Sequence, residues 1–185
     1  MNDTIIETPR LRLRRWTLSD YAPFYSLNSD PVVMEFMLKT LSKKESNGFI
    51  RRIEESFDLL GFGFWALELK QENLFIGFTG LFSPTFQSHF TPCIEIGWRL
   101  GKEFWGNGFA TEAASAALDF GFNTAKFDEI VSFTTQTNHR SRAVMRRLNM
   151  THDPKDDFDH PSLPERHALR RHVLYRLKKE QYAPE

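Results

Sequence analysis

The sequence contains one cysteine, no excess of either charge and no long apolar run. With Cys93 alone, neither an intramolecular disulfide nor a metal site built from cysteines can form, and such sparing use of cysteine fits a reducing compartment. Lysine plus arginine and aspartate plus glutamate number 24 each, whereas general nucleic-acid binders carry a basic excess. No apolar stretch reaches the roughly eighteen residues that suggest a membrane span. We therefore expect a cytoplasmic protein that binds neither nucleic acid nor membranes.

Repeats, low-complexity tracts and Gly/Ser-rich linkers are absent too. The 185 residues are 41% hydrophobic and 26% charged, an ordinary globular balance, so we expect one domain over residues 1–185. The 18 phenylalanines stand out, because rings in such number build tight cores and clefts.

Hydrophobic periodicity and capping residues predict the elements. In the first half we expect a strand at 11–14, a helix from Tyr21 that Asp30-Pro31 ends, a second helix from the capping box Ser42–Glu45 to about Leu60, and strands at 64–69 and 74–82. In the second half we expect a polar loop at 83–92, a strand at 93–100, an alanine-rich helix at 111–125, a strand at 129–135, a short helix at 141–148 and a last strand at 172–177.

The lengths of the connections predict how these strands pair. Short connections make the mid-chain strands antiparallel, whereas the strands on either side of the alanine-rich helix are joined by a crossover and should run parallel and adjacent. The fold class is therefore α/β (α+β), with a mixed sheet flanked by helices.

A glycine-containing loop follows the strand that ends at Leu100. Gly106 and Gly108 let backbone N–H groups approach a ligand, and the helix that opens near Phe109 directs free N–H groups and its positive end toward the loop. Such a loop can bind a pyrophosphate, although an ordinary strand-to-helix turn has the same pattern. A Walker loop would need a lysine followed by serine or threonine, and a dinucleotide fingerprint would need a third glycine.

Two segments carry a resemblance to a known family. Residues 95–100 and 104–113 resemble the central motif of the GNAT superfamily of N-acetyltransferases, whose pattern Q/R-x-x-G-x-G/A falls on Trp105, Gly108 and Ala110, with tryptophan in place of the polar first residue. Residues 137–150 resemble the family's N-x-x-S-x-x-V-x-x-x-L-G-F/M segment, with Asn149 where glycine is usual. Asparagine tolerates the left-handed conformation that a helix end requires. The resemblance is closest to the RimJ/RimL-like branch.

This resemblance implies a GNAT fold, a mostly antiparallel mixed sheet in which a central parallel strand pair splays apart. It implies acetyl-CoA as the acetyl donor, with no metal. The residues that it assigns to the donor are Trp98, Arg99, Leu100, Trp105, Gly106, Asn107, Gly108, Phe109, Ala110, Thr111, Asn138 and Ser141. Asn138 and Ser141 are also of the types that begin a helix.

The resemblance also suggests the catalytic groups. Glu95 matches a general-base glutamate that works directly or through water, and an apolar, aromatic cleft would raise its pKa. Ser141 and Tyr175 are alternative acids for the departing thiolate. The segment 156–164 is interpreted as a substrate-facing loop rather than a metal cluster, with His160 or His167 near the amine or in a structural role.

The predicted function is acetyl-CoA-dependent N-acetyl transfer to a primary amine, either a protein N-terminus or a small molecule, by a monomer or homodimer. The alternative is a catalytically idle acyl-CoA-binding or regulatory module on the same fold, because a fold does not determine a function.

Overall fold

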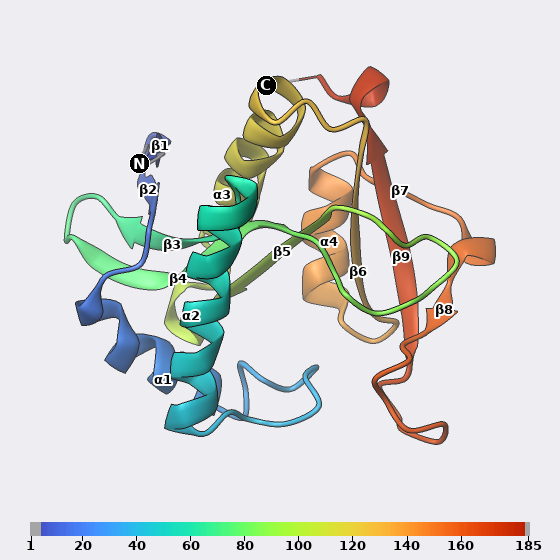
Figure 1. The fold of residues 1–185 in the computed structure, drawn as a ribbon, viewed down its shortest axis with the longest axis horizontal. Helices are drawn as coiled ribbons and strands as arrows, with labels where there is room; N and C mark the ends of the chain where they lie inside the picture. The colour runs from blue at the N-terminus through green and yellow to red at the C-terminus, as the bar shows by residue number, and fades with distance from the viewer. Residues whose placement is uncertain (1–4, 184–185) are drawn as a thin grey trace.

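A single mixed sheet forms the centre of the protein in the computed structural model, which describes residues 5–183 (Figure 1). Its strands in those residues are β1 Ile6–Glu7, β2 Leu11–Arg14, β3 Phe64–Leu69, β4 Leu74–Phe82, β5 Glu95–Leu100, β6 Glu129–Thr135, β7 Thr151–His152, β8 Phe158–Asp159 and β9 Arg171–Lys178. The α-helices are α1 Tyr21–Ser29, α2 Lys43–Leu60, α3 Phe109–Asp119 and α4 His139–Arg147.

The strand order is β1-β2-β3-β4-β5-β6-β9-β7, and β8 also pairs with β9. Neighbouring strands run antiparallel except β5 and β6, which are parallel. This confirms the expected mixed sheet, because α3 makes the crossover between those two strands.

Helices cover opposite faces of the sheet. On one face, which we call the α1/α2 face, Phe24 of α1 and Phe49 of α2 pack against Phe78 of β4, with ring centroids 5.8 and 5.9 Å away. The loop at 83–92 crosses the β6–β9 half of this face (Figure 1). The α3/α4 face is covered by α3 over β5 and α4 over β6. No helix within residues 5–183 combines the length and apolarity needed to cross a membrane.

Local signals set several helix ends as predicted. Ser42 Oγ accepts a hydrogen bond from the Glu45 N–H at 3.3 Å, and the Glu45 carboxylate accepts the Ser42 N–H at 2.8 Å, which confirms the capping box. Asn149, directly after the C-cap of α4, adopts a φ of 58°, the left-handed conformation expected where the family has glycine.

Other boundaries differ from the predictions. The alanine-rich helix begins at Phe109 rather than Thr111, because Gly108 caps it in a left-handed conformation, and Phe120–Thr124 continues it as a wide π turn. The strand predicted from Cys93 begins at Glu95. The strands β1, β7 and β8 were not predicted, since two residues are too few to show a period.

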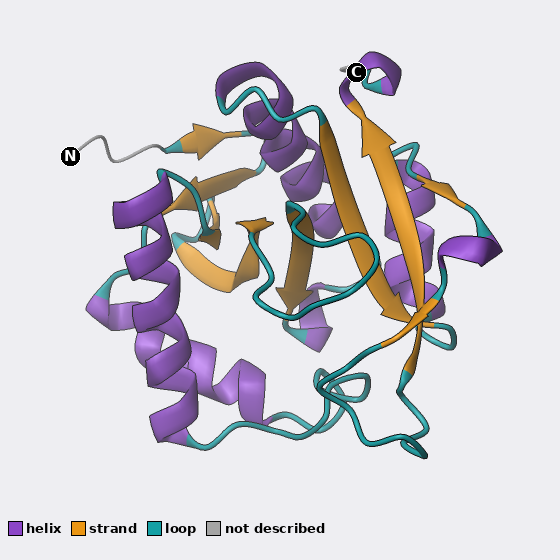
Figure 2. Ribbon diagram, turned by 45° about the vertical axis from the view of Figure 1, so that its right-hand side comes forward, coloured by secondary structure: helices purple, strands orange, loops and turns teal. Residues whose placement is uncertain are grey.

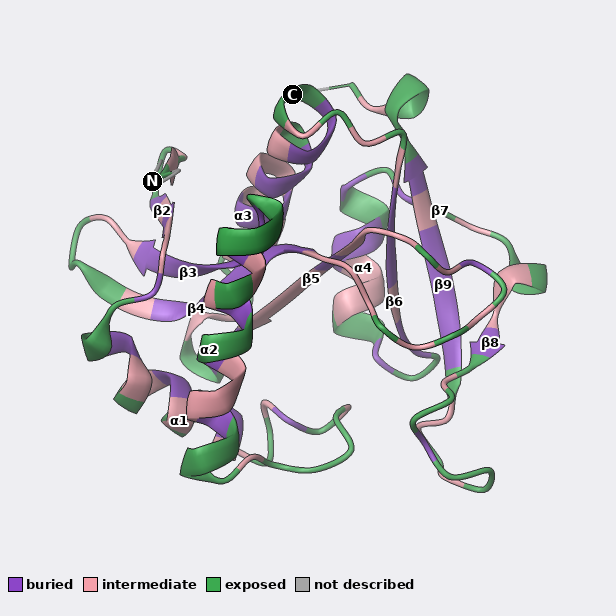
Figure 3. Cartoon of the chain, viewed as in Figure 1, coloured by how far each residue is buried: buried purple, intermediate pink, exposed green. Residues whose placement is uncertain are grey.

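Buried apolar residues form two clusters, and Figure 3 shows the long β9 as mainly buried. The larger cluster lies between the sheet and the helices. The smaller one contains Phe90, Val131, Phe158 and Leu174, with Phe86 and Phe133 packed against it. The loop predicted to be polar therefore contributes two phenylalanines to this packing.

Close approach of β3 and β4 requires glycine at position 80. Its φ is 154°, and a Cβ there would lie 2.1 Å from the Gly63 carbonyl oxygen and 2.8 Å from the Phe64 Cα. We expect Gly80→Ala to lower the free energy of unfolding by about 3 kcal/mol, because backbone atoms would have to move. Denaturant unfolding measures the change.

The matched control is Gly48→Ala within α2, where a Cβ would meet its nearest atom, Arg52 Nη1, at 3.6 Å. This change should raise the free energy of unfolding by about 0.5–1 kcal/mol, because alanine favours helix. Equal effects of the two substitutions would contradict a steric requirement at Gly80.

Candidate functional site

Strand β5 presents different side chains to the two faces of the sheet. Alternation puts Glu95, Gly97 and Arg99 on the α1/α2 face and the intervening residues on the α3/α4 face. Of the latter, Ile96 and Leu100 are buried in the main core. One strand therefore contributes polar side chains to one side of the sheet and apolar packing to the other.

The parallel strands β5 and β6 pair over a very short length. Their register consists of Glu95 opposite Val131, with the Val131 N–H donating to the Ile94 carbonyl at 2.8 Å. Ser132 Oγ adds a bond to the Ile96 carbonyl at 2.9 Å. Beyond this point the strands run apart (Figure 2), which confirms the splayed central pair. The remaining backbone of β5 on that side is open to a ligand.

A cavity of about 1720 Å³ passes through this opening. Phe64, Phe82 and Glu95 line it on the α1/α2 face, and Leu118 and Val144 line it on the α3/α4 face. It is larger than a typical small-molecule pocket. Two reactants can therefore enter from opposite faces of the sheet and meet at β5.

The glycine loop forms one rim of the cavity. Gly106 and Gly108 both have a φ of 79°, and Trp105 Nε1 donates to the Leu100 carbonyl at 2.9 Å, which holds the loop against the end of β5. The first N–H groups of α3 have no acceptor within the helix and face the loop. Asn107 is the one predicted donor contact that does not line the cavity, since its side chain donates to the carbonyls of Phe104 and Trp105.

A carboxylate in the first turn of α3 ties this helix to the connection between β1 and β2. Glu112 accepts hydrogen bonds from Thr8 Oγ1 at 2.6 Å, the Arg10 N–H at 2.9 Å and Arg10 Nε at 2.6 Å. The Arg10 guanidinium also lies over the Phe109 ring, 4.5 Å from its centroid. Sequence reasoning missed Arg10, because a contact about a hundred residues away leaves no local signal.

The predicted pair Asn138 and Ser141 meets at the start of α4. Asn138 Oδ1 accepts the Ser141 N–H at 3.2 Å, so Asn138 is the N-cap. Its Nδ2 donates to Thr134 Oγ1 at 2.9 Å and to Ser141 Oγ at 3.2 Å. Both Asn138 and Ser141 line the cavity. Because Ser141 Oγ accepts from Asn138, its own proton is free to be donated into the cavity.

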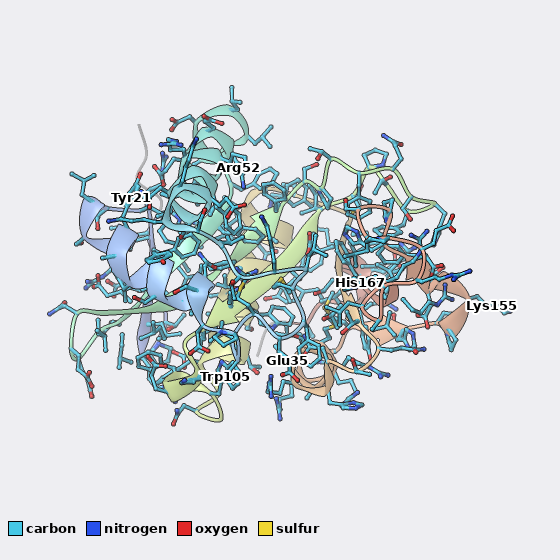
Figure 4. The ribbon with its side chains drawn as sticks, turned by 90° about the horizontal axis from the view of Figure 1, so that it is seen from below. Tyr21, Glu35, Arg52, Trp105, Lys155 and His167 are labelled. Carbon is cyan, nitrogen blue, oxygen red and sulfur yellow. The ribbon has the colours of Figure 1, made fainter. Side chains whose placement is uncertain are left out.

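Arg140, in the first turn of α4, contacts residues from two distant parts of the chain. Its guanidinium lies 4.3 Å from the Trp105 ring centroid and pairs with Glu35 at 2.9 Å. Figure 4 shows Glu35 and Trp105 at the same end of the molecule. Nothing local in the sequence indicates this contact, which joins residues 35, 105 and 140.

Glu95 lies in the floor of the cavity. Within residues 5–183 its carboxylate has no salt bridge, and burial raises its pKa to about 8. The rings of Phe49, Phe64, Phe78 and Phe82 line the same cavity. A group with this pKa exchanges protons near neutral pH, as a general base must.

Two predicted catalytic residues lie away from the cavity lining. Tyr175 is 3% exposed, with its ring stacked on His152 at 5.0 Å and its hydroxyl accepting from Arg142 Nε at 3.4 Å. His160 packs against Phe86, with ring centroids 4.7 Å apart. Burial, and to a smaller extent the charge of nearby His172, lowers the pKa of His160 to about 4. Neither residue is brought beside Glu95 by the fold.

His167, the other histidine suggested to lie near the amine, is also outside the cavity lining. Its Nδ1 accepts the Leu169 N–H at 3.1 Å, and Figure 4 shows it in the opposite half of the view from Tyr21 of α1. Within residues 5–183, no group of three or more His, Cys, Asp or Glu side chains is placed to hold a metal ion.

A splayed parallel pair next to a glycine loop that begins a helix is the arrangement expected of a GNAT-type acyltransferase. The sequence profile of a family described as "Acetyltransferase (GNAT) domain" matches residues 10–151. The chain therefore belongs to the GNAT acetyltransferase family and is an N-acetyltransferase. Members of this family use acetyl-CoA.

Individual proteins show the same relation. The uncharacterized protein YkkB of Bacillus subtilis is 29% identical over 80% of this chain and 85% of its own length. A GNAT-family acetyltransferase from Bacillus anthracis superposes with a TM-score of 0.78 at 21% identity, covering 96% of this chain and 99% of that one. RimL, a ribosomal L7/L12 alpha-N-protein acetyltransferase in complex with coenzyme A, superposes at 0.77 with 16% identity, covering 97% and 100%. At these identities the solved structures show the shared fold alone.

The raised pKa of Glu95 makes the stability of the fold depend on pH. A carboxyl whose pKa is higher in the folded than in the unfolded state stabilises the fold below its unfolded pKa, and this contribution is lost as pH rises through about 8. Glu95→Gln should therefore match the parent protein at pH 5 and be more stable at pH 9, by about 2 kcal/mol after allowance for water in the cavity. Thermal unfolding of both proteins at the two pH values measures the difference in their free energies of unfolding. A difference that does not change with pH would mean that Glu95 titrates normally.

Proposed function

We propose that this protein transfers the acetyl group of acetyl-CoA directly to a primary amine, with Glu95 as the general base. The observation that carries the proposal is the position of the Glu95 carboxylate, in an aromatic cavity at the point where β5 and β6 separate. A base is required there because an ammonium group must lose a proton before its nitrogen can attack a thioester.

The donor enters from the α3/α4 face in this proposal. Backbone N–H groups of residues 105–111 bind the pyrophosphate, assisted by the positive end of α3. The pantetheine arm follows the unpaired edge of β5, where Trp98, Arg99 and Leu100 supply backbone groups. Asn138 contributes from the start of α4. The fold shared with RimL, whose structure contains coenzyme A, supports this arrangement.

Proton transfers complete the reaction. Glu95 takes a proton from the ammonium, directly or through a water molecule, and the amine nitrogen attacks the thioester carbonyl. The C–N bond forms, the nitrogen gives up its second proton, and the C–S bond breaks. The thiolate receives a proton from the acid, which is restored by the proton that the nitrogen gave up. Ser141 is the preferred acid, because its hydroxyl proton is free and it lines the cavity, whereas Tyr175 does not. A backbone N–H of β5 polarises the carbonyl.

The acceptor is a primary amine that enters from the α1/α2 face. Resemblance to the RimJ/RimL-like branch favours a peptide N-terminus, and the aromatic walls also suit a small molecule. The alternative, an idle acyl-CoA-binding module, does not account for a carboxylate with a raised pKa in the opening.

Binding of the donor is tested with Gly108→Ala. Alanine at a φ of 79° is strained, and its Cβ would lie 3.4 Å from Arg10 Nη2, so the loop should distort. We expect the affinity for CoA, measured by titration calorimetry, to fall at least about tenfold, which is roughly 1.4 kcal/mol.

Gly61→Ala is the matched control. Gly61 also has a φ of 79°, with no atom within 4 Å of an added Cβ, and it lies after α2 outside the cavity lining. Its strain should be similar while CoA affinity stays unchanged. Equal affinity for CoA in all three proteins would place the donor elsewhere.

The base is tested by the pH dependence of kcat/KM with a peptide amine. Because Glu95 must be ionised, kcat/KM should rise with pH up to about 8. Glu95→Gln should lower it by about 10²-fold or more and leave only the inflection that belongs to the amine. Glu103→Gln, an exposed change outside the cavity lining, should keep the parent profile.

An unchanged rate and profile in Glu95→Gln would remove Glu95 as the base. Tight CoA binding without thiol release from any amine in a panel of peptides and small molecules would instead support the idle module.

A further inference from the structure

The side chain of Arg99 lies on the same face of β5 as Glu95, four residues further along the strand. At a rise of about 3.3 Å per residue, their Cα atoms are roughly 13 Å apart. Both side chains line the cavity, and the intervening Gly97 has no side chain. An acceptor that enters from the α1/α2 face therefore encounters a carboxylate at one end of the floor and a guanidinium at the other.

The groups that contact this guanidinium are all uncharged. Nη1 donates to Asn28 Oδ1 at 2.5 Å, Nη2 contacts Met37 Sδ at 3.1 Å, and the guanidinium carbon lies 5.3 Å from the Phe78 ring centroid. Thioether sulfur is a weak acceptor, and a guanidinium has five N–H groups to donate. Within residues 5–183, no carboxylate lies within 4.0 Å of Arg99.

Two other partly buried arginines in this protein have anionic partners. Arg14 contacts Asp20 at 2.7 Å and Glu68 at 2.7 Å, and Arg176 contacts Glu129 and Asp156, each at 2.7 Å. A cation in a protein interior is costly unless an anion accompanies it. Burial lowers the pKa of Arg99 to about 10, which still leaves it charged at neutral pH. Arg99 is thus a cation in an aromatic cavity without its counter-charge.

Buried neighbours hold Arg99 in position. Asn28 is 0% exposed, its Nδ2 donates to the equally buried Ser46 Oγ at 3.1 Å, and its backbone carbonyl accepts the Leu41 N–H at 2.9 Å. The guanidinium is therefore oriented before any ligand arrives, which lowers the entropy cost of binding.

We infer that Arg99 binds a carboxylate of the acceptor, so that the substrate is an amino-carboxylate whose amine lies at Glu95 and whose apolar body lies over Phe64 and Phe78. This inference rests on the proposed acetyl transfer. An α-amino acid is too short to reach both groups, whereas a small peptide or an ω-amino acid has the required separation. Polyamines are disfavoured, because a second ammonium would approach the guanidinium.

The experiment compares matched amines that differ only in the carboxylate. Glycyl-phenylalanine and 5-aminopentanoate are each assayed against their carboxamides, at saturating acetyl-CoA, for kcat/KM. The acid should be preferred at least about tenfold, because a charge-assisted hydrogen bond is replaced by a neutral one. In Arg99→Gln this ratio should fall to near one, Arg99→Lys should restore part of it, and the KM for acetyl-CoA should change less than about twofold.

Two further variants separate recognition from a general effect on the fold. Asn28→Asp keeps Arg99 but supplies it with an internal carboxylate at the position of Oδ1, so it should abolish the preference for the acid while the protein stays folded. Arg51→Gln removes an exposed arginine of α2 outside the cavity lining and should leave the ratio unchanged.

Binding of 3-phenylpropionate to the CoA complex, measured by calorimetry, gives a readout that needs no turnover. Loss of this binding in Arg99→Gln, together with no turnover of any amine, would retain the carboxylate site and reject acetyl transfer. Equal or faster turnover of the carboxamides or of a polyamine, or 3-phenylpropionate binding that is equal in Arg99→Gln, would overturn the inference.

Discussion

Separation of β5 from β6 is the constraint on which the rest of the structure depends. The two strands share one register pair, Glu95 opposite Val131, and a side-chain bond from Ser132. Backbone groups that a regular sheet would pair remain open beyond that point, and unpaired backbone in a protein interior needs a partner. A substrate arm with amide groups can provide one. The same separation connects the two faces of the sheet through one cavity.

Two sets of contacts hold β5 in this geometry. Ile96 and Leu100, on its α3/α4 face, belong to the main core, and the edge of β5 away from β6 pairs with β4 along the whole strand. Trp105 attaches the loop to the end of β5, and Glu112 attaches the start of α3 to the connection between β1 and β2. The glycine loop is thus held at one rim by contacts that are independent of any ligand.

Glu95 and Arg99 give the cavity floor an unusual electrostatic character. Neither has a partner of opposite charge within residues 5–183. Burial favours the neutral form of each group, so it raises the pKa of Glu95 and lowers the pKa of Arg99. At neutral pH the carboxyl, with a pKa of about 8, is largely protonated while the guanidinium stays charged. An ammonium close to Glu95 would lower the pKa of this carboxyl, and an anion close to Arg99 would neutralise the floor. A substrate that carries both charges satisfies both groups at once.

Local chemistry within the sequence determined much of this protein. The capping box at Ser42, the left-handed Asn149 and the pairing expected from connection lengths all followed from short-range rules, and the family motifs indicated the splayed pair. Tertiary structure alone decided which side chains meet. Arg10 contacts Glu112, Asn28 orients Arg99, and Tyr175 and His160 pack away from the cavity lining. These contacts join residues far apart in the chain, and since their free energy comes from burial and pairing in the folded state, neither periodicity nor spacing indicates them.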